Sequence, residues 1–76
     1  MKELIVLIAK TLVDNPDNVS VQKVEGESTI VYELQVEKTD VGKIIGKKGN
    51  TARAIRTILN AAGRKNNKRV MLEIIE

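Results

Sequence analysis

Apolar residues near the start of the chain recur at the spacing of a helix. They predict a helix over residues 2–13. The apolar face of this helix consists of Ile5, Ile8 and Leu12, with Leu4 beside them. The β-branched residues within 4–9 leave a short strand open as an alternative. Pro16 cannot continue a helix, and Asn15 tolerates a left-handed conformation, so the element is expected to end near them.

Two stretches after this helix alternate between apolar and polar residues, which is typical of half-buried strands. They predict strands over residues 19–25 and 29–37, joined by a turn at Gly26-Glu27-Ser28 and paired as an antiparallel hairpin. The apolar face of the second strand consists of Ile30, Tyr32, Leu34 and Val36. Because Tyr32 lies on this face, packing in the core is favoured over a role as a base-stacking platform.

The second half of the chain predicts two helices and a final strand. Their ranges are residues 40–45, 50–62 and 69–75. Thr39 or Asp40 can cap the first helix, which is expected to end at Gly46. Gly63 is expected to stop the second helix. The apolar stripe of that second helix consists of Ala52, Ile55, Ile58, Leu59 and Ala62.

The predicted order of elements is α-β-β-α-α-β, which indicates an α+β fold. We expect the hairpin and the last strand to form a three-stranded sheet, with all three helices packed on one face of it. A chain of 76 residues is near the lower size for one adequate core, so residues 1–76 are expected to form a single domain.

Charge is distributed unevenly between the two halves. Residues 1–40 carry four lysines against eight aspartates and glutamates, whereas residues 41–76 carry nine lysines and arginines against two glutamates. A basic half suggests a polyanionic partner, although a solubilising surface is the plainer explanation of a charge run.

Composition argues against several classes of function. The chain has no cysteine, which removes disulfides and thiolate metal sites and fits a cytoplasmic location. It has no histidine, which removes the usual general base and the commonest zinc ligand. No paired catalytic constellation is visible, so we expect no enzyme, no cofactor and no metal. No apolar run is long enough to cross a membrane.

One short motif carries the functional signal. In Gly46-Lys47-Lys48-Gly49, two glycines bracket two lysines immediately before a predicted helix. Glycine allows a tight turn and a close approach of a ligand to the backbone, and the helix start offers unpaired N–H groups. The same four residues can also be an ordinary solvated turn. The spacing fails the Walker loop and the dinucleotide fingerprint.

The stretch Ile44-Ile45-Gly46-Lys47-Lys48-Gly49, between two helices, resembles the signature of KH domains, whose loop clamps about four backbone nucleotides. The element order is similar to that of type II KH domains. Beyond the loop, stretches at residues 12–17, 40–49 and 51–62 resemble KhpA-type small bacterial KH proteins. This resemblance covers nearly the whole chain.

The resemblance implies a cytoplasmic, sequence-tolerant RNA-binding protein that forms a homodimer or pairs with a Jag-type KH protein. Nucleic acid would cross a groove between the two central helices and the middle strand of the sheet. The residues implied in binding are Gly46, Lys47, Lys48 and Gly49 for the sugar-phosphate backbone, Ile44, Ile45 and Ile55 for bases, and Lys43, Arg53 and Arg56 as further contacts. For Ile45 and Ile55, a place in the core is slightly favoured.

The leading hypothesis is therefore a noncatalytic module for single-stranded RNA, with single-stranded DNA possible because nothing in the loop reads a 2′-hydroxyl. Tyr32 is the only aromatic residue, so contacts to bases would be modest and one domain should bind weakly. A dimer would tether a second binding groove. The alternative is a protein-interaction module, favoured by the wide apolar faces of the helices at 2–13 and 50–62.

Overall fold

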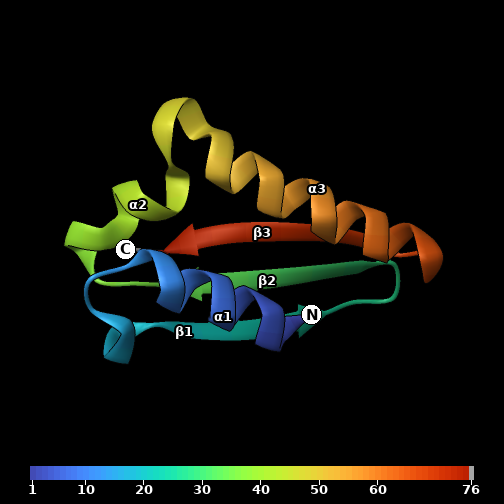
Figure 1. Ribbon diagram of the computed structural model, residues 1–76. Helices are drawn as coiled ribbons and strands as arrows, with labels where there is room; N and C mark the ends of the chain where they lie inside the picture. The colour runs from blue at the N-terminus through green and yellow to red at the C-terminus, as the bar shows by residue number, and fades with distance from the viewer. Residues whose placement is uncertain (76) are drawn as a thin grey trace.

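The computed structural model describes residues 1–75 and consists of a three-stranded sheet with helices along one face (Figure 1). The helices are α1 (Lys2–Leu12), α2 (Val41–Ile45) and α3 (Asn50–Lys65), and the strands are β1 (Ser20–Glu25), β2 (Thr29–Gln35) and β3 (Arg69–Ile75). Single 3₁₀ turns occupy Pro16–Asn18, Lys38–Asp40 and Lys47–Gly49. The predicted order of elements and the α+β class are confirmed.

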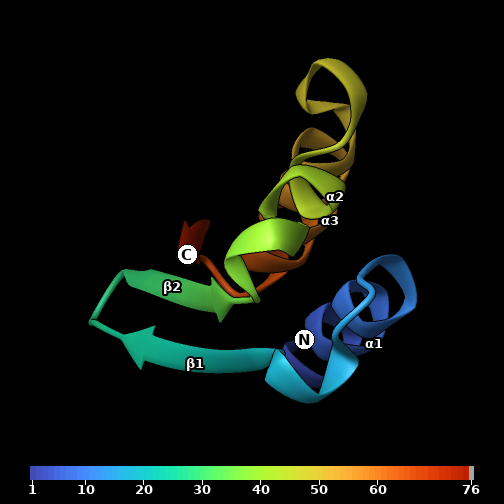
Figure 2. The ribbon, with the colours of Figure 1, turned by 90° about the vertical axis from the view of Figure 1, so that its left-hand side faces the viewer.

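The strands lie in the order β1-β2-β3, so β2 is central and β3 is an edge strand. β1 and β2 form the expected antiparallel hairpin, whereas β3 runs parallel to β2. Tyr32 illustrates the register, since its Cα partners are Lys23 on one side and Leu72 on the other. A parallel pair needs a long crossover, which α2 and α3 supply. Figure 2 shows all the helices on the same side of the sheet.

α1 is a helix, so the alternative of a short strand is excluded. It ends at Leu12 because Val13 is extended, with φ −93° and ψ 160°. Asn15 does not adopt the left-handed conformation that it tolerates, since its φ is −118°. Asn15 instead uses its N–H groups to bind a distant carboxylate, as described below.

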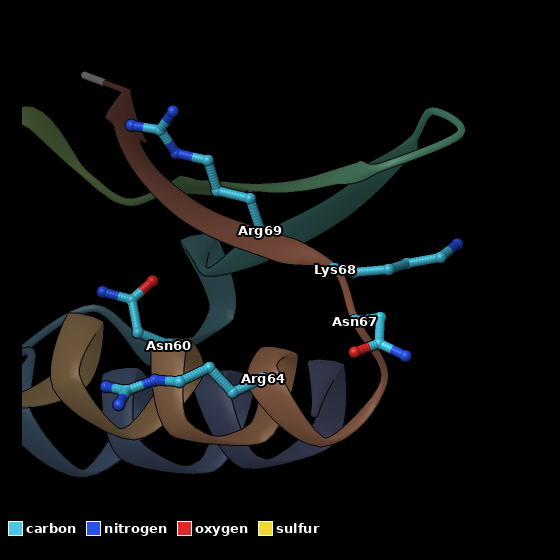
Figure 3. A pocket seen from close by; sticks show the side chains of 5 residues that line it. All are labelled: Asn60, Arg64, Asn67, Lys68 and Arg69. Carbon is cyan, nitrogen blue, oxygen red and sulfur yellow. The ribbon is translucent and has the colours of Figure 1, made fainter.

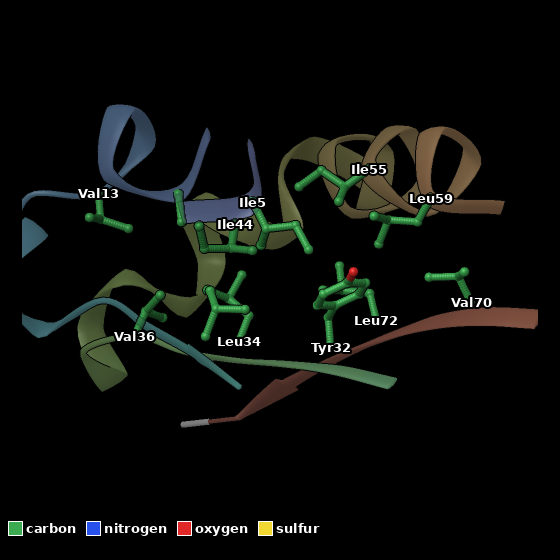
Figure 4. Packing of buried hydrophobic residues seen from close by; sticks show 12 residues of the cluster. Ile5, Val13, Tyr32, Leu34, Val36, Ile44, Ile55, Leu59, Val70 and Leu72 are labelled. Atoms are coloured by element: carbon green, nitrogen blue, oxygen red, sulfur yellow. The ribbon is translucent and has the colours of Figure 1, made fainter. Parts of the chain in front are cut away.

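The core lies between the helices and the sheet (Figure 4). Its buried hydrophobic residues are Ile5, Ala9 and Val13 from the first helix and its end, Val21, Tyr32, Leu34, Val36, Val70 and Leu72 from the sheet region, and Ile44, Ile55 and Leu59 from the other helices. Tyr32 is 4% exposed, which confirms its place in the core. This burial of aliphatic surface is the main force that stabilises the fold.

The predicted end of the third helix at Gly63 is wrong. α3 continues to Lys65, and Gly63 is buried within it. A Cβ atom at Gly63 would lie 2.5 Å from the carbonyl oxygen of Lys68, so glycine allows α3 to approach the start of β3. The left-handed residue after the helix is Asn67, at φ 55°. The amide of Lys68 donates to the carbonyl of Gly63, which completes a Schellman-type end.

The apolar stripe of α3 is narrower than expected. Ala52, Ile55 and Leu59 are buried, but Ile58 is 47% exposed and lies outside the core. Gly63 extends the buried stripe by one further turn from Leu59. The outer side of α3 therefore carries an apolar side chain that nothing in the described part of the chain covers.

Candidate nucleic-acid interface

The four-residue motif forms a tight bend between α2 and α3. Gly46 has φ 77° and ψ 174°, Gly49 has φ 76°, and Lys48 also has a positive φ of 57°. The amide of Gly49 donates to the carbonyl of Gly46 over 3.1 Å, which closes the turn. Positive φ is easy for glycine and costs other residues free energy, so the positive φ at both ends of the motif explains its two glycines.

Gly46 is required for a second reason. A Cβ atom there would clash with Oγ1 of Thr51 and lie 2.9 Å from the Thr51 amide nitrogen. The bend is therefore packed directly against the first turn of α3. At Gly49, by contrast, no described residue other than its chain neighbours lies within 4 Å of the added Cβ, so its backbone conformation alone favours glycine.

Lys47 and Lys48 lie at the tip of this bend, and both are exposed. Neither takes part in any ion pair formed between described residues. No side chain caps the N-terminus of α3. The tip thus combines two ammonium groups with the positive end of a 16-residue helix, which is a favourable environment for an anion. Figure 1 shows the bend projecting beyond the sheet.

A row of basic and amide side chains continues from the bend along α3. Its members are Arg53, Arg56, Asn60 and Arg64, spaced three or four residues apart, and all of them are exposed. Residues at this spacing lie on the same side of a helix. α3 therefore carries a basic row from the bend to its C-terminal end.

Beside this row, α3 and β3 enclose two neighbouring hollows. One has a volume of about 190 Å³ and is lined by Arg56, Asn60, Arg69, Val70, Met71 and Leu72. The other, of about 420 Å³, is lined by Asn60, Arg64, Asn67, Lys68 and Arg69 (Figure 3). Asn60 and Arg69 line both, so the hollows form one groove along the edge of the sheet, which we call the α3–β3 groove.

The α3–β3 groove borders β3, whereas the resemblance implied a nucleic-acid groove against the middle strand. β2 is that middle strand, and its helix-facing side chains are buried in the core. β3 is the edge strand, so its outer edge is free to meet α3 and solvent. Lys47 and Lys48 are not among the residues that line the groove. They lie at the N-terminal end of the helix that forms one of its walls.

Sequence reasoning assigned none of the five residues that line the larger hollow, namely Asn60, Arg64, Asn67, Lys68 and Arg69. Helical spacing from Arg56 could have found Asn60 and Arg64. Arg69 required knowledge that β3 is an edge strand beside α3. Lys68 also lines the groove, but its ammonium group is hydrogen-bonded to Glu25.

The three isoleucines that were expected near bases differ in exposure to solvent. Ile44 is fully buried, which corrects the expectation that it offers apolar surface to bases. Ile55 is 5% exposed and lies in the core, as was slightly favoured, so it offers no such surface either. Ile45 is 40% exposed, so the preference for a core position was wrong there. Of the three, only Ile45 can meet a ligand beside the bend.

Lys43 is held by carboxylates rather than left free. Its ammonium group is hydrogen-bonded to Asp14 and lies 3.7 Å from Oδ1 of Asp40. The hydrogen bond to Asp14 raises the pKa of Lys43, with the charges of both carboxylates adding to the effect. A phosphate would have to compete with these two groups, so Lys43 is a weaker candidate contact than Lys47 or Lys48.

Asp40 connects α2 to the segment that follows α1. Its side chain is 1% exposed and makes no capping bond to α2, contrary to expectation. It accepts hydrogen bonds from the backbone N–H of Asp14 at 3.3 Å and of Asn15 at 3.1 Å, and from the Asn15 side-chain amide at 3.0 Å. The carboxylate thus anchors the helix that leads into the bend.

The electrostatics of Asp40 follow from these contacts. Burial acts to raise the pKa of Asp40, but the hydrogen bonds from Asn15 and Asp14 and the charge of Lys43 outweigh burial. The pKa of the carboxyl group is therefore lowered, and the group is ionised near neutral pH. Within the described residues, no buried side-chain nitrogen or oxygen lacks a hydrogen-bond partner.

Two kinds of feature are absent from residues 1–75. No cluster of three or more aspartate or glutamate side chains is arranged to hold a metal ion. No helix has both the length and the apolar character needed to cross a bilayer.

Comparison with known proteins assigns the chain to a family. The chain is 57% identical over 76 residues to RNA-binding protein KhpA of Aquifex aeolicus, covering all of this chain and 96% of that protein. It is 54% identical to the protein of the same name from Chlamydia pneumoniae, over all of this chain and 97% of the relative. It is 55% identical to RNA-binding protein KhpA of Clostridium perfringens, over 99% of this chain and 100% of that protein. No solved structure matches. The profile of the KhpA/KhpB KH domain matches residues 2–74, so the chain belongs to the KhpA/KhpB family of KH-domain proteins.

Proposed function

We propose that this protein is a noncatalytic RNA-binding protein that holds a short single-stranded RNA segment at the bend between α2 and α3. The relatives reported above are all named RNA-binding proteins, which supports this class of function over an enzyme. The observation that carries the proposal is the exposure of Lys47 and Lys48 at the N-terminus of α3, where neither forms an ion pair with a described residue.

In this proposal the bend and the α3–β3 groove act together. Lys47 and Lys48 contact phosphates, while glycine at positions 46 and 49 lets the RNA backbone approach the main chain. Arg53 and Arg56 provide further cationic contacts along α3. Ile45 is an exposed aliphatic side chain beside the bend, and we assign it the apolar contact to a base.

The decisive experiment replaces both lysines at the tip with aspartate. A matched control changes Lys2 and Lys38 to aspartate, since both are exposed, lie outside the proposed surface and give the same net charge. We expect the tip variant to lose binding to a fluorescent single-stranded RNA oligonucleotide, and the control variant to lose much less. Equal loss of RNA binding in both variants would mean that overall charge alone explains the effect. Full RNA binding by a folded tip variant would refute the proposal.

Salt dependence and the chemistry of the sugar provide two further tests. The logarithm of the binding constant should fall against the logarithm of salt concentration with a slope of about −0.7 for each phosphate neutralised. Parallel titration with a DNA oligonucleotide of the same sequence tests the 2′-hydroxyl. Equal affinity would extend the ligand class to single-stranded DNA, because neither the glycines nor the lysines distinguish the two backbones.

We further propose that the protein acts in post-transcriptional regulation in the cytoplasm, as a homodimer or paired with a Jag-type KH protein. One KH module with few aromatic side chains holds a few nucleotides weakly, and a second module on the same RNA raises the effective affinity. A competing proposal is a pure protein-interaction module, favoured by the exposure of Leu7 and Ile58. Sedimentation with and without RNA separates the two, because a pure interaction module should not shift on adding oligonucleotide.

A further inference from the structure

A third hollow lies over the sheet, between the start of α1 and the end of α3. Its volume is about 230 Å³, and its lining includes Lys23, Ile30, Tyr32, Ala62, Lys68 and Val70. α1 packs on β1 and α3 packs on β3, so the two helices leave part of the sheet between them uncovered (Figure 2). Ala62 adds only a methyl group to the wall and leaves the space open. We call this space the α1–α3 hollow.

The hydroxyl group of Tyr32 reaches this hollow without a partner. Tyr32 is a core residue, and its oxygen points from the sheet toward the helices (Figure 4). The hydroxyl forms no hydrogen bond with a described residue. The described residues nevertheless include no sealed polar atom that lacks a partner, so the oxygen is open to the hollow that Tyr32 lines. Because a buried tyrosine hydroxyl normally has a partner, a ligand in the hollow would supply the one that the chain does not.

The two lysines of the hollow share one carboxylate. The ammonium group of Lys68 is hydrogen-bonded to Oε2 of Glu25, and Nζ of Lys23 lies 3.3 Å from Oε1 of the same residue. Each ammonium group has three N–H donors, so contact with Glu25 leaves donors free on both. Two ammonium groups against one carboxylate also leave an excess of one positive charge. The lysines therefore favour an anion beside the hollow.

We propose that the α1–α3 hollow binds a small organic anion, a carboxylate or a phosphate monoester with a compact apolar body. The aliphatic side chains of Ile30, Ala62 and Val70 give the body an apolar wall. The lysines bind the acid group, and the Tyr32 hydroxyl hydrogen-bonds to a ligand oxygen. Pockets for drug-sized ligands usually measure about 300 to 1,000 Å³, so this smaller hollow suits a ligand of about ten non-hydrogen atoms.

The α1–α3 hollow is separate from the surface proposed for RNA. Arg64 and Arg69 line the α3–β3 groove and do not line this hollow. Lys68 lines both, but its ammonium group points away from the guanidinium groups of Arg64 and Arg69 (Figure 3). The bend that carries Lys47 and Lys48 lies at the opposite end of α3 (Figure 1). The proposed ligand is therefore a small molecule and not an RNA segment.

NMR titration of the native, isotope-labelled chain with benzoate tests the proposal. We expect saturable shifts of the amide signals of Lys23, Tyr32 and Lys68, with a dissociation constant of about 0.1 to 10 mM, as is usual for a ligand of this size. Benzyl alcohol lacks the charge and acetate lacks the ring, so each should bind at least about tenfold more weakly. Phenyl phosphate in parallel distinguishes a phosphate from a carboxylate as the preferred acid group.

Two results of these titrations would overturn the proposal. One is the absence of saturable binding by both benzoate and phenyl phosphate over that range. The other is benzyl alcohol binding as tightly as benzoate, since the lysines would then have no part in recognition.

Tyr32→Phe isolates the hydroxyl group. Because the hydroxyl has no partner among the described residues, the melting temperature should stay within about 2 °C of the native value. Benzoate affinity should nevertheless fall about fivefold, through loss of one hydrogen bond to the ligand. Unchanged benzoate affinity in the folded variant would overturn the proposed site.

Ala62→Leu tests the hollow by filling it. Ala61→Leu is the matched control, because it adds the same atoms to the adjacent, exposed position of α3. We expect Ala62→Leu to weaken benzoate binding about tenfold or more and Ala61→Leu to bind as the native chain does. Equal benzoate affinity in the two variants, both with native-like NMR spectra, would place the ligand elsewhere and overturn the inference.

A short RNA oligonucleotide separates this inference from the proposed function. RNA held at the bend should leave the benzoate affinity of the native chain within about twofold of its value without RNA. Full displacement of benzoate by the oligonucleotide would assign the hollow to RNA and overturn the inference. Failure of the native chain to bind RNA would refute the proposed function and leave the benzoate result standing.

Discussion

Asp40 and Asn15 are 25 residues apart in sequence and are joined by two hydrogen bonds, from the backbone and side-chain N–H groups of Asn15 to the same carboxylate oxygen. This contact ties the segment after α1 to the start of α2, a helix of five residues that is too short to be stable alone. α2 leads directly into the glycine-flanked bend. The position of the proposed RNA contact thus depends on a buried carboxylate that contacts no RNA itself.

Replacing Asp40 with asparagine should lower the melting temperature by about 5 to 10 °C, because an amide cannot accept all three hydrogen bonds made by the carboxylate. Asp17→Asn is the control, since Asp17 is exposed and forms no ion pair within the described residues. Thermal unfolding followed by circular dichroism checks both. Equal melting temperatures for the native chain and Asp40→Asn would show that the anchor is dispensable.

The same carboxylate should make stability depend on pH in the acid range. The pKa of Asp40 is lowered in the folded chain, so the stabilisation is complete above the unfolded pKa of about 3.9 and is lost as pH falls through the folded value. The pKa of Glu25 is also lowered, by Lys68 and Lys23, and acts in the same direction. The gap in melting temperature between the native chain and Asp40→Asn should narrow from pH 6 to pH 2.5. A constant gap would exclude titration of Asp40 as its cause.

Three glycines of the α2–α3 region should respond differently to alanine. Gly46→Ala should destabilise the fold by about 2 kcal/mol or more, since it adds a clash with Thr51 to the strain of positive φ. Gly49→Ala should cost about 1 kcal/mol from strain alone. Gly42→Ala should stabilise by about 0.5 kcal/mol, because Gly42 is helical and has open space around it. Denaturant unfolding measures all three, and a different ranking would contradict the geometry of the bend.

Gly63 provides a test of the packing of α3 on the sheet. In an exposed helix, glycine to alanine stabilises by up to about 1 kcal/mol. At Gly63 the added methyl would meet the Lys68 carbonyl and the Val70 side chain, both at 2.5 Å, so we expect a loss of about 2 kcal/mol. Ala61→Gly at an exposed position is the comparison and should cost the ordinary helix penalty. Stabilisation by Gly63→Ala would mean that α3 does not approach the start of β3 this closely.

The α3–β3 groove should contribute to RNA affinity beyond the bend. Arg64→Gln and Arg69→Gln each remove one charge from its lining, and each should weaken RNA binding several-fold and reduce the magnitude of the salt slope by about 0.7. Lys23→Gln removes a charge that lies outside this groove and is the control. Unchanged RNA binding in both arginine variants would mean that RNA contacts the bend and not the α3–β3 groove.

The local pattern of the sequence predicted most of the elements. The alternation around Tyr32 predicted β2 and its buried face, and the glycines at 46 and 49 predicted a bend that only a permissive backbone can form. These features depend on neighbours within a few residues, so they can be read from the chain alone. Membership of the KH family, inferred from the loop and the flanking helices, is confirmed by the comparisons.

The predictions that the structure contradicted concern residues whose roles depend on contacts between distant segments. Gly63 looks like a helix stop, but it is a point of close approach to Lys68 and Val70. Asp40 looks like a helix cap, but it binds the backbone of another segment. The edge position of β3, which decides where the groove lies, follows from its pairing with β2 alone.

The sequence by itself therefore determined most of the elements, the buried face of β2 and the charged bend, because periodicity and backbone preference act locally. The tertiary structure decided which exposed lysines stay free, which isoleucines reach the surface and which strand borders the groove. Those outcomes depend on distances across the fold, and the order of residues along the chain does not specify them.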